Sequence, residues 1–407
     1  MKKLLLSIAV VMSAMSVNAQ VATLNVAKVA DMDKNVYSMD ITSSAVYTKN
    51  VMKAPVKLAA GANTFIEIGQ EKTKGVHEEQ KTIFKTNNVT MELTGESGDY
   101  KGTSYPKVKI TGIGEGFGTV TGYVDDANGK IYIPRQVCYE YPDPSKNFGK
   151  MYFEALVRKG GKVAWDGTDA VLFKTENGYV AFEGKETEGA IYGWVITMPE
   201  YQTGQSAWAY GIASDFFPQN GVEHGFYRNE KTKKYDEGTK PIFIDDRGDE
   251  LSVYNFVGVS KVDMLVDSES NDVYITVGQP IAILNIEDPA TYGEYFRLYA
   301  YKRTGDTNIM VDNDAENIMA KKTNNVIATS KDTYFGIWSK FDSNSAGYRF
   351  GIYADMSWTK NADPTGITDV NSSAKKGDNK FYNLAGQRVN ANTPGIVIRN
   401  GRKFLNK

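Results

Sequence analysis

Val124-Asp125-Asp126-Ala127-Asn128-Gly129-Lys130-Ile131-Tyr132-Ile133 decides the fold of this chain, because Val266-Asp267-Ser268-Glu269-Ser270-Asn271-Asp272-Val273-Tyr274-Ile275 repeats its pattern further on. In both stretches, apolar and β-branched residues flank a short polar run. Asn-Gly accepts the positive φ angles that a tight hairpin turn requires, and short β-branched runs around such a turn are typical of paired strands. The two stretches therefore predict the same β-hairpin at two places in the chain.

Four further similarities follow the hairpin in the same order and at a nearly constant separation. They are Asp143-Pro144 with Asp288-Pro289, Phe148–Tyr152 with Tyr292–Phe296, Tyr192-Gly193-Trp194 with Phe335-Gly336-Ile337, and Tyr210–Ala213 with Phe350–Tyr353. An ordered series of this kind indicates a tandem duplication. We therefore expect two copies of one fold, with Tyr132 equivalent to Tyr274 and Tyr152 equivalent to Phe296.

The expected fold class is all-β, with two tandem antiparallel β units, each a sandwich or an up-and-down barrel, and a small β tail at the C-terminus. Short β-rich runs separated by turn residues, with no helical stretch between them, favour antiparallel connections. The predicted segments are a signal peptide (1–19), a lead-in that is partly strand (20–80), β unit copy 1 (81–218), an inter-unit loop (219–240), β unit copy 2 (241–360), a flexible linker (361–380) and a C-terminal β segment (381–407).

The net charge of the chain and the composition of its first residues indicate which partners it binds and in which compartment it acts. The chain has 47 basic and 49 acidic residues, so no cationic excess is present to neutralise phosphates, which argues against nucleic acid as a partner. Lys2 and Lys3, a short apolar run and Val17-Asn18-Ala19 have the pattern of a cleaved secretion signal. The sequence predicts an exported protein, extracellular or on the outer cell surface, with no transmembrane segment in the mature chain.

The C-terminal segment carries a recognisable motif. Its residues are Tyr382, Leu384, Gly386, Gln387, Arg388 and Val389, then Gly395, Ile396 and Ile398, then Asn400, Gly401 and Lys403. This segment resembles the C-terminal sorting domains of the type IX secretion system, which end many secreted proteins of the Bacteroidota. The resemblance implies an export machinery as a partner of the tail. The repeated units are similar only to tandem β units of uncharacterised secreted proteins from the same group.

No residue pattern of a known catalytic site is present. His77 and His224 form no pair at metal-ligand spacing, and Cys138, the only cysteine, is expected to be a small buried hydrophobe. Asp312, Asp314 and Glu316 alternate as carboxylates do in calcium loops, so they are the candidate metal ligands, with calcium as the candidate cofactor.

The tryptophans are the candidate ligand-contacting residues. Trp194 aligns with Ile337 and Trp208 with Tyr348, which predicts core positions for both, whereas Trp165 lies in a turn without a counterpart and is predicted to be exposed. Loops carry binding residues more often than the scaffold does. We therefore predict a non-catalytic extracellular binding protein, with a glycan as the candidate ligand and Trp165 as the candidate contact. The alternatives are a hydrolase with a carboxylate pair and a structural or adhesive surface protein.

Overall fold

The computed structural model describes most of residues 58–361 and four short strands of the C-terminal segment. Left out are 73–81, 115, 117, 143–147, 176–177, 186, 202–205, 230–231, 233, 284–293, 305–308, 340, 343–344 and 347–348, and after 361 only 381–382, 388–389, 395–399 and 402–406 are described. The described residues form strands and turns and no helix, which confirms the predicted all-β class. The predicted signal peptide and linker lie outside them.

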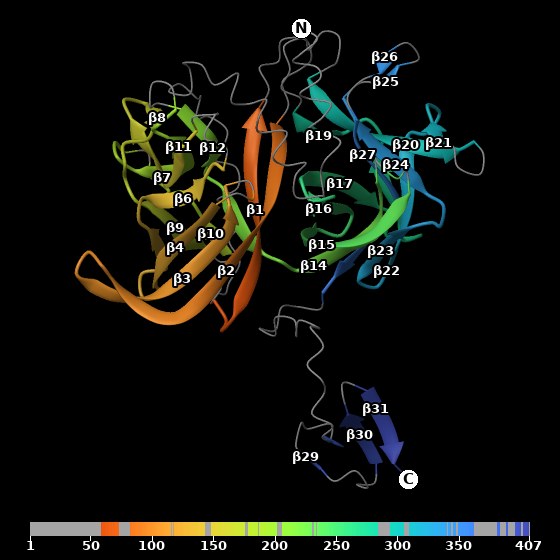
Figure 1. Ribbon diagram of the computed structural model, residues 1–407. Coiled ribbons are helices and arrows are strands. Elements are labelled where there is room, and N and C mark those ends of the chain that lie inside the picture. The colour runs from red at the N-terminus through yellow and green to blue at the C-terminus, as the bar shows by residue number, and fades with distance from the viewer. Residues whose placement is uncertain are drawn as a thin grey trace. The chain divides into compact units, whose positions relative to one another are not determined.

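The first β unit is a closed antiparallel barrel (Figure 1). Its strands, in order around the barrel, are β1 (Ala62–Lys72), β2 (Thr82–Tyr100), β3 (Thr103–Ile113), β4 (Gly118–Asp125), β5 (Lys130–Ile133), β9 (Ala170–Thr175), β10 (Gly178–Val180) and β13 (Asp215–Pro218). Each strand pairs with the next, and β13 pairs with β1 to close the ring.

A second sheet accompanies this barrel. It contains β6 (Gln136–Glu140), β7 (Lys150–Lys159), β11 (Ile191–Met198) and β12 (Ser206–Ile212), with the short β8 (Lys162–Ala164) beside β7. Apolar residues of this sheet and of the barrel belong to one continuous core. Cys138, on β6, is buried in that core and donates its thiol to the Met151 carbonyl, and burial raises the pKa of the thiol to about 12. The expectation of a structural cysteine is confirmed.

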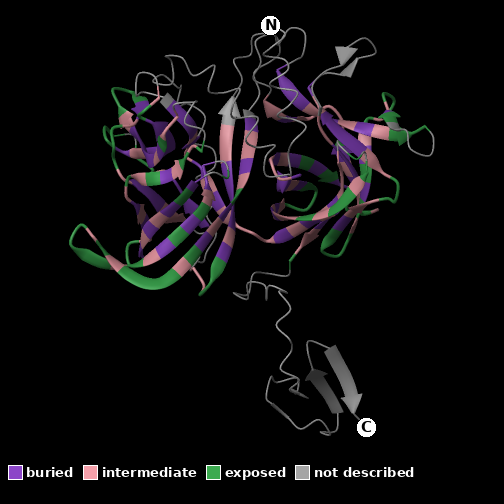
Figure 2. Ribbon diagram, viewed as in Figure 1, coloured by how far each residue is buried: buried purple, intermediate pink, exposed green. Residues whose placement is uncertain are grey.

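The second β unit is an eight-stranded closed barrel with the same topology. Its strands are β14 (Gly221–Arg228), β15 (Tyr235–Asp246), β16 (Glu250–Phe256), β17 (Ser260–Val266), β18 (Asp272–Thr276), β22 (Asn317–Thr323), β23 (Val326–Thr329) and β27 (Arg349–Lys360). The accompanying strands are β19 (Pro280–Ile283), β20 (Tyr295–Arg303), β21 (Ile309–Val311) and β24 (Tyr334–Trp338), and β25 (Phe341–Asp342) pairs separately with β26 (Ser345–Ala346). In both units buried residues alternate with exposed ones along many of the strands (Figure 2), and the buried hydrophobic residues of each unit form a core.

Strand register confirms the duplication and corrects one of its details. Tyr132 pairs across β4–β5 with Tyr123, and Tyr274 pairs across β17–β18 with Leu265, so the two hairpins are equivalent. On β7 and β20, however, Phe153 rather than Tyr152 is equivalent to Phe296, because Phe153 and Phe296 both point into the core. A shift by one residue turns a side chain to the opposite face of a sheet, so the predicted match of Tyr152 with Phe296 is wrong by one position.

The predicted unit boundaries also need correction. Residues 219–240, predicted as an inter-unit loop, contain all of β14 and the first half of β15. The lead-in 20–80 is partly strand, as predicted, but its strand β1 belongs to the first barrel. On β14 the inward positions are Gly221, Glu223 and Gly225, all buried. Because none of these three residues is apolar and large, β14 lacks the alternating hydrophobic pattern by which strands are recognised.

The two barrels are joined by hydrogen bonds and by an aromatic cluster. Thr86 on β2 donates to the Ser260 carbonyl (3.1 Å), and the Asn255 amide donates to Asn88 (2.8 Å). Ile66, Ile68 and Tyr254 are buried together with partly buried phenylalanines, among them Phe217 and Phe243, whose rings stack at 4.7 Å. The residues around this junction are therefore held on ordered strands of both barrels.

The C-terminal residues Gly366–Lys407 form a unit of their own. Within it, β28 (Phe381–Tyr382), β29 (Arg388–Val389), β30 (Gly395–Arg399) and β31 (Arg402–Asn406) pair as one antiparallel sheet. This agrees with the predicted small β tail.

Candidate binding face of the second barrel

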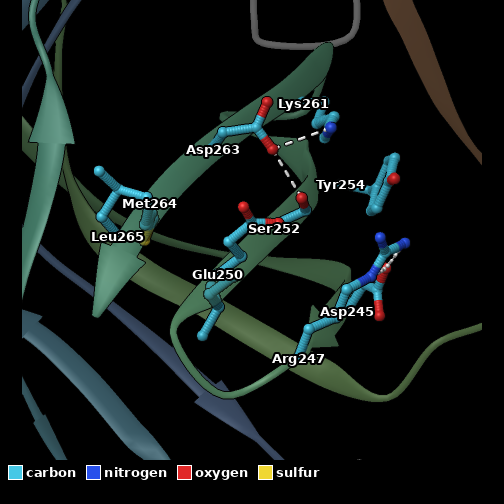
Figure 3. A pocket seen from close by; sticks show the side chains of 10 residues that line it. Asp245, Arg247, Glu250, Ser252, Tyr254, Lys261, Asp263, Met264 and Leu265 are labelled. Atoms are coloured by element: carbon cyan, nitrogen blue, oxygen red, sulfur yellow. Dashed lines mark hydrogen bonds and ion pairs between the residues drawn. The ribbon is translucent and has the colours of Figure 1, made fainter. Parts of the chain in front are cut away.

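A shallow concavity of about 330 Å³ lies on the outer face of β15, β16 and β17 (Figure 3). The row Asp245, Ser252 and Asp263 crosses the three strands, since Asp245 pairs with Ser252 and Ser252 pairs with Asp263. Alternation along each strand sends the apolar neighbours of these residues inward, where they form part of the barrel core. The barrel thus aligns three polar side chains on one rigid surface.

Charged groups of both signs lie beside this row. The guanidinium group of Arg247 donates to one oxygen of Asp245, from Nη2 at 2.7 Å and from Nε at 3.0 Å. Asp263 accepts from Ser252 Oγ at 2.6 Å and forms an ion pair with Lys261 Nζ at 2.8 Å. The Lys261 ammonium also lies over the Tyr254 ring, 5.5 Å from its centroid. These internal contacts fix the orientation of the donors and acceptors that face solvent.

The edge of the concavity is apolar. Leu265 is 55% exposed, and it also lines an adjoining hollow together with Thr276 and Gln279. Alternating donors and acceptors next to an apolar side chain suit a ligand that bears several hydroxyl groups and has an apolar face. The barrel interiors, in contrast, are filled by their own core side chains.

The carboxyl groups whose pKa is raised lie elsewhere. Burial raises the pKa of Asp215, on β13, to about 7 and raises that of Glu223, on β14. Neither residue lines the concavity, and they belong to different barrels. Asp215 and Glu223 therefore do not form a carboxyl pair with each other.

From the raised pKa of Asp215 we predict how the stability of the protein depends on pH. The pKa of Asp215 in the folded protein lies above the ordinary value of 3.8, because the neighbouring Ile68 and Val180 are buried and apolar. The free energy of unfolding therefore falls as the pH rises from about 4 to about 7, and it stays low at higher pH. Asp215→Asn removes the ionised form. It should raise the free energy of unfolding by roughly 2–4 kcal/mol at pH 8 and leave it nearly unchanged at pH 3.5. Urea unfolding at both pH values measures this, and an equal effect at both would contradict the assignment.

Trp165, the predicted ligand contact, is only half-exposed. It lies directly after β8 and packs against a small cluster made by Leu156, Val195 and Ala207. The prediction of a freely exposed turn residue is therefore wrong, because the second sheet supplies an apolar surface that the indole covers. Trp194 and Trp208 are both 2% exposed, which confirms their predicted core positions.

Two of the three predicted metal ligands lie beside a lysine. Asp312 and Asp314 lie 3.0 Å and 3.6 Å from Lys302 Nζ, and Asp312 also accepts a backbone hydrogen bond from Asp314. The Lys302 ammonium thus supplies positive charge to this loop. Glu316 is exposed at the end of the loop, and no group of three or more metal-binding side chains occurs among the described residues.

The remaining sequence candidates fall partly outside the described residues. Of the sorting-like motif, Tyr382 lies on β28, Arg388 and Val389 on β29, Gly395 on β30 and Lys403 on β31, whereas Leu384, Gly386, Gln387 and Gly401 are not described. His224 lies on β14 and contacts Glu237 at 2.7 Å, so it is not a loop residue.

Two buried glutamates escaped the sequence reasoning. Glu67 on β1 and Glu223 on β14 occupy equivalent positions, opposite Phe216 and Trp358 respectively. Glu67 accepts from the Trp194 indole at 2.6 Å, and Glu223 accepts from the Trp358 indole at 2.9 Å. For Glu67, its place inside the apolar run Phe65–Ile68 was the available signal, whereas the glycines and His224 around Glu223 gave none.

Comparisons with family models, with curated proteins and with solved structures found no match. Among the described residues, no helix has the length and apolar character needed to cross a bilayer.

Proposed function

We propose that this protein is an exported, non-catalytic binding protein whose second barrel binds a glycan at the concavity on β15–β17. The observation that carries the proposal is the ordered row Asp245–Ser252–Asp263, with Arg247 and Lys261 beside it and Leu265 at its edge. Sugars present hydroxyl groups around an apolar ring face, and paired carboxylates and cations on a rigid surface can bind those hydroxyl groups.

The leader and the tail support the location. A cleavable signal pattern begins the chain, and the C-terminal segment resembles type IX sorting domains. An extracellular or cell-surface position would expose the concavity to polysaccharides. The hydrolase and the adhesive surface protein remain the competing functions.

A glycan array with the full mature chain tests the proposal. For any glycan that binds, Asp263→Ala should weaken the affinity at least tenfold, because a carboxylate that accepts charge-assisted hydrogen bonds contributes about 1.5–3 kcal/mol. The matched control is Thr121→Ala, since Thr121 on β4 occupies the position equivalent to Asp263 in the first barrel. Equal losses in both variants, or hydrolysis of the bound glycan, would contradict the proposal.

A further inference from the structure

The duplication brings the same row of outward-facing positions to both barrels. In the first barrel the row is Lys107, Tyr123, Tyr132 and Val171, and in the second it is Glu250, Leu265, Tyr274 and Met319. Each member pairs with the next across neighbouring strands. The two rows can therefore be compared position by position on one scaffold.

In the first barrel, this row is covered by the chain itself. β2 and β3 continue past the barrel as a long hairpin arm, residues 94–106, most of which are exposed (Figure 2). Tyr100 of the arm stacks on Tyr123 at 5.5 Å and on Tyr132 at 4.9 Å. At the end of the row, Val171 is only 8% exposed.

Two further contacts hold the arm on this face. The Tyr100 hydroxyl donates to Asp169 at 2.9 Å, and Lys101 forms an ion pair with the same carboxylate at 3.0 Å. Gly98 lies so close to Tyr123 that a β-carbon would be 3.1 Å from the ring. The arm is thus fitted to the barrel by an aromatic ring, a phenol hydrogen bond and a close backbone approach.

In the second barrel, the equivalent row is uncovered. The hairpin between β15 and β16 is a short turn, residues 247–249, and no arm extends from it. Leu265 is 55% exposed and Met319 is 44% exposed. Tyr274 between them is half-buried, and among the described residues it has no ring or hydrogen-bond partner. An apolar strip of this kind on an ordered sheet favours an interaction site.

We propose that the strip Leu265–Tyr274–Met319 is a docking surface for a tyrosine-bearing β-hairpin of a partner protein. The first barrel provides the template, because its equivalent row is covered by a hairpin that inserts one tyrosine. Stacking of such a ring on Tyr274, with Leu265 and Met319 on either side, repeats the observed packing, and aromatic pairs contribute beyond the area that they bury.

One substitution in the second barrel specifies the partner further. Asn317 occupies the place of Asp169, since each directly precedes the equivalent residues Ala170 and Ile318. An amide can still hydrogen-bond a phenol, but it gives no ion pair to a lysine such as Lys101. The docking hairpin therefore needs the tyrosine and does not need the adjacent cation.

The first test uses the arm as the probe. A fluorescent peptide of residues 93–108, closed by a disulfide between cysteines in place of the paired Leu93 and Val108, is titrated into the full chain. We expect saturable binding that weakens at least tenfold with the Tyr100→Ala peptide and with the Leu265→Ser/Met319→Ser chain. The control chain carries Val137→Ser, an exposed apolar residue on β6. Glycan binding at Asp263 is expected to survive the Met319→Ser change alone, which separates this surface from the proposed function.

A second test does not depend on folding of the peptide. A copy of residues 94–107, the arm of the first barrel, replaces residues 247–250 of the second barrel in the full chain. The same chain carries Met319→Cys, and the alkylation rate of this cysteine measures whether the grafted arm covers the strip. Cys138 is buried and does not compete. The graft should slow alkylation of the cysteine at position 319 at least fivefold. The reference is the same graft with alanine in place of the grafted copy of Tyr100. Two outcomes would overturn the proposal. The first is that the two grafts are alkylated at equal rates and that all peptides and chains bind equally. The second is that the unmodified chain self-associates and Tyr100→Ala abolishes this, because the occupant would then be a second copy of the chain.

Discussion

Glu223→Ala is expected to lower the free energy of unfolding by about 3–5 kcal/mol, because it removes the common acceptor of three donors, two of them buried. The Glu223 carboxylate accepts from the Val257 backbone N–H at 3.0 Å, from the Tyr227 hydroxyl at 3.0 Å and from the Trp358 indole at 2.9 Å. Glu223 and Trp358 are both fully buried, so water cannot replace the lost acceptor.

Glu223→Gln is the matched control for this change. Glutamine keeps the shape and one acceptor oxygen, and it carries no charge. Because burial raises the pKa of Glu223, the ionised carboxyl is disfavoured in the folded state, and stability falls as the pH rises from the ordinary pKa of 4.5 to the raised one. We therefore expect Glu223→Gln to cost less than Glu223→Ala. Denaturant unfolding of both variants measures the difference, and an alanine variant as stable as the parent would show that the three donors find other partners.

The duplication was predictable because short sequence patterns recur in the same order in both copies. The hairpins around Asn128-Gly129 and Asn271-Asp272 were expected from turn chemistry, and both form, with positive φ at Gly129 and Asn271. Local patterns of this kind survive in sequence because the turn itself demands the residue.

The buried acids and the concavity were not predictable in the same way. Glu67 meets Trp194 only when β1 and β11, far apart in the sequence, pack together. Asp245, Ser252 and Asp263 lie on three consecutive strands, and their row depends on the register of two hairpins that no turn motif in the sequence specified. In β14, moreover, small inward residues replace the apolar ones that mark a strand. Gly225 leaves space that the Met356 side chain fills, so the packing is completed from β27 and no trace of it appears in β14 itself.

The equivalent glutamates show how the two copies diverged while keeping one requirement. In the first barrel the indole comes from Trp194, whose counterpart in the second is Ile337; in the second it comes from Trp358, whose counterpart in the first is Phe216. The tryptophan has changed strands, and the buried carboxyl has kept an indole donor. A buried acid needs a hydrogen-bond partner, whereas the strand that supplies it is free to vary.

Trp194→Ala should therefore destabilise the first barrel by about 3–5 kcal/mol, the usual effect of emptying a buried aromatic site. Its ring stacks on Phe153 at 5.7 Å, and its loss also removes the indole donor to Glu67. Trp194→Phe keeps most of the ring volume and removes only the donor, so its effect should be intermediate. Trp165→Ala, at a half-exposed position on the cluster around Leu156, should cost only about 1–2 kcal/mol. Thermal and denaturant unfolding of the three variants should give the order Trp194→Ala, Trp194→Phe, Trp165→Ala, and the reverse order would mean that the indole at 165, not the one at 194, completes the core.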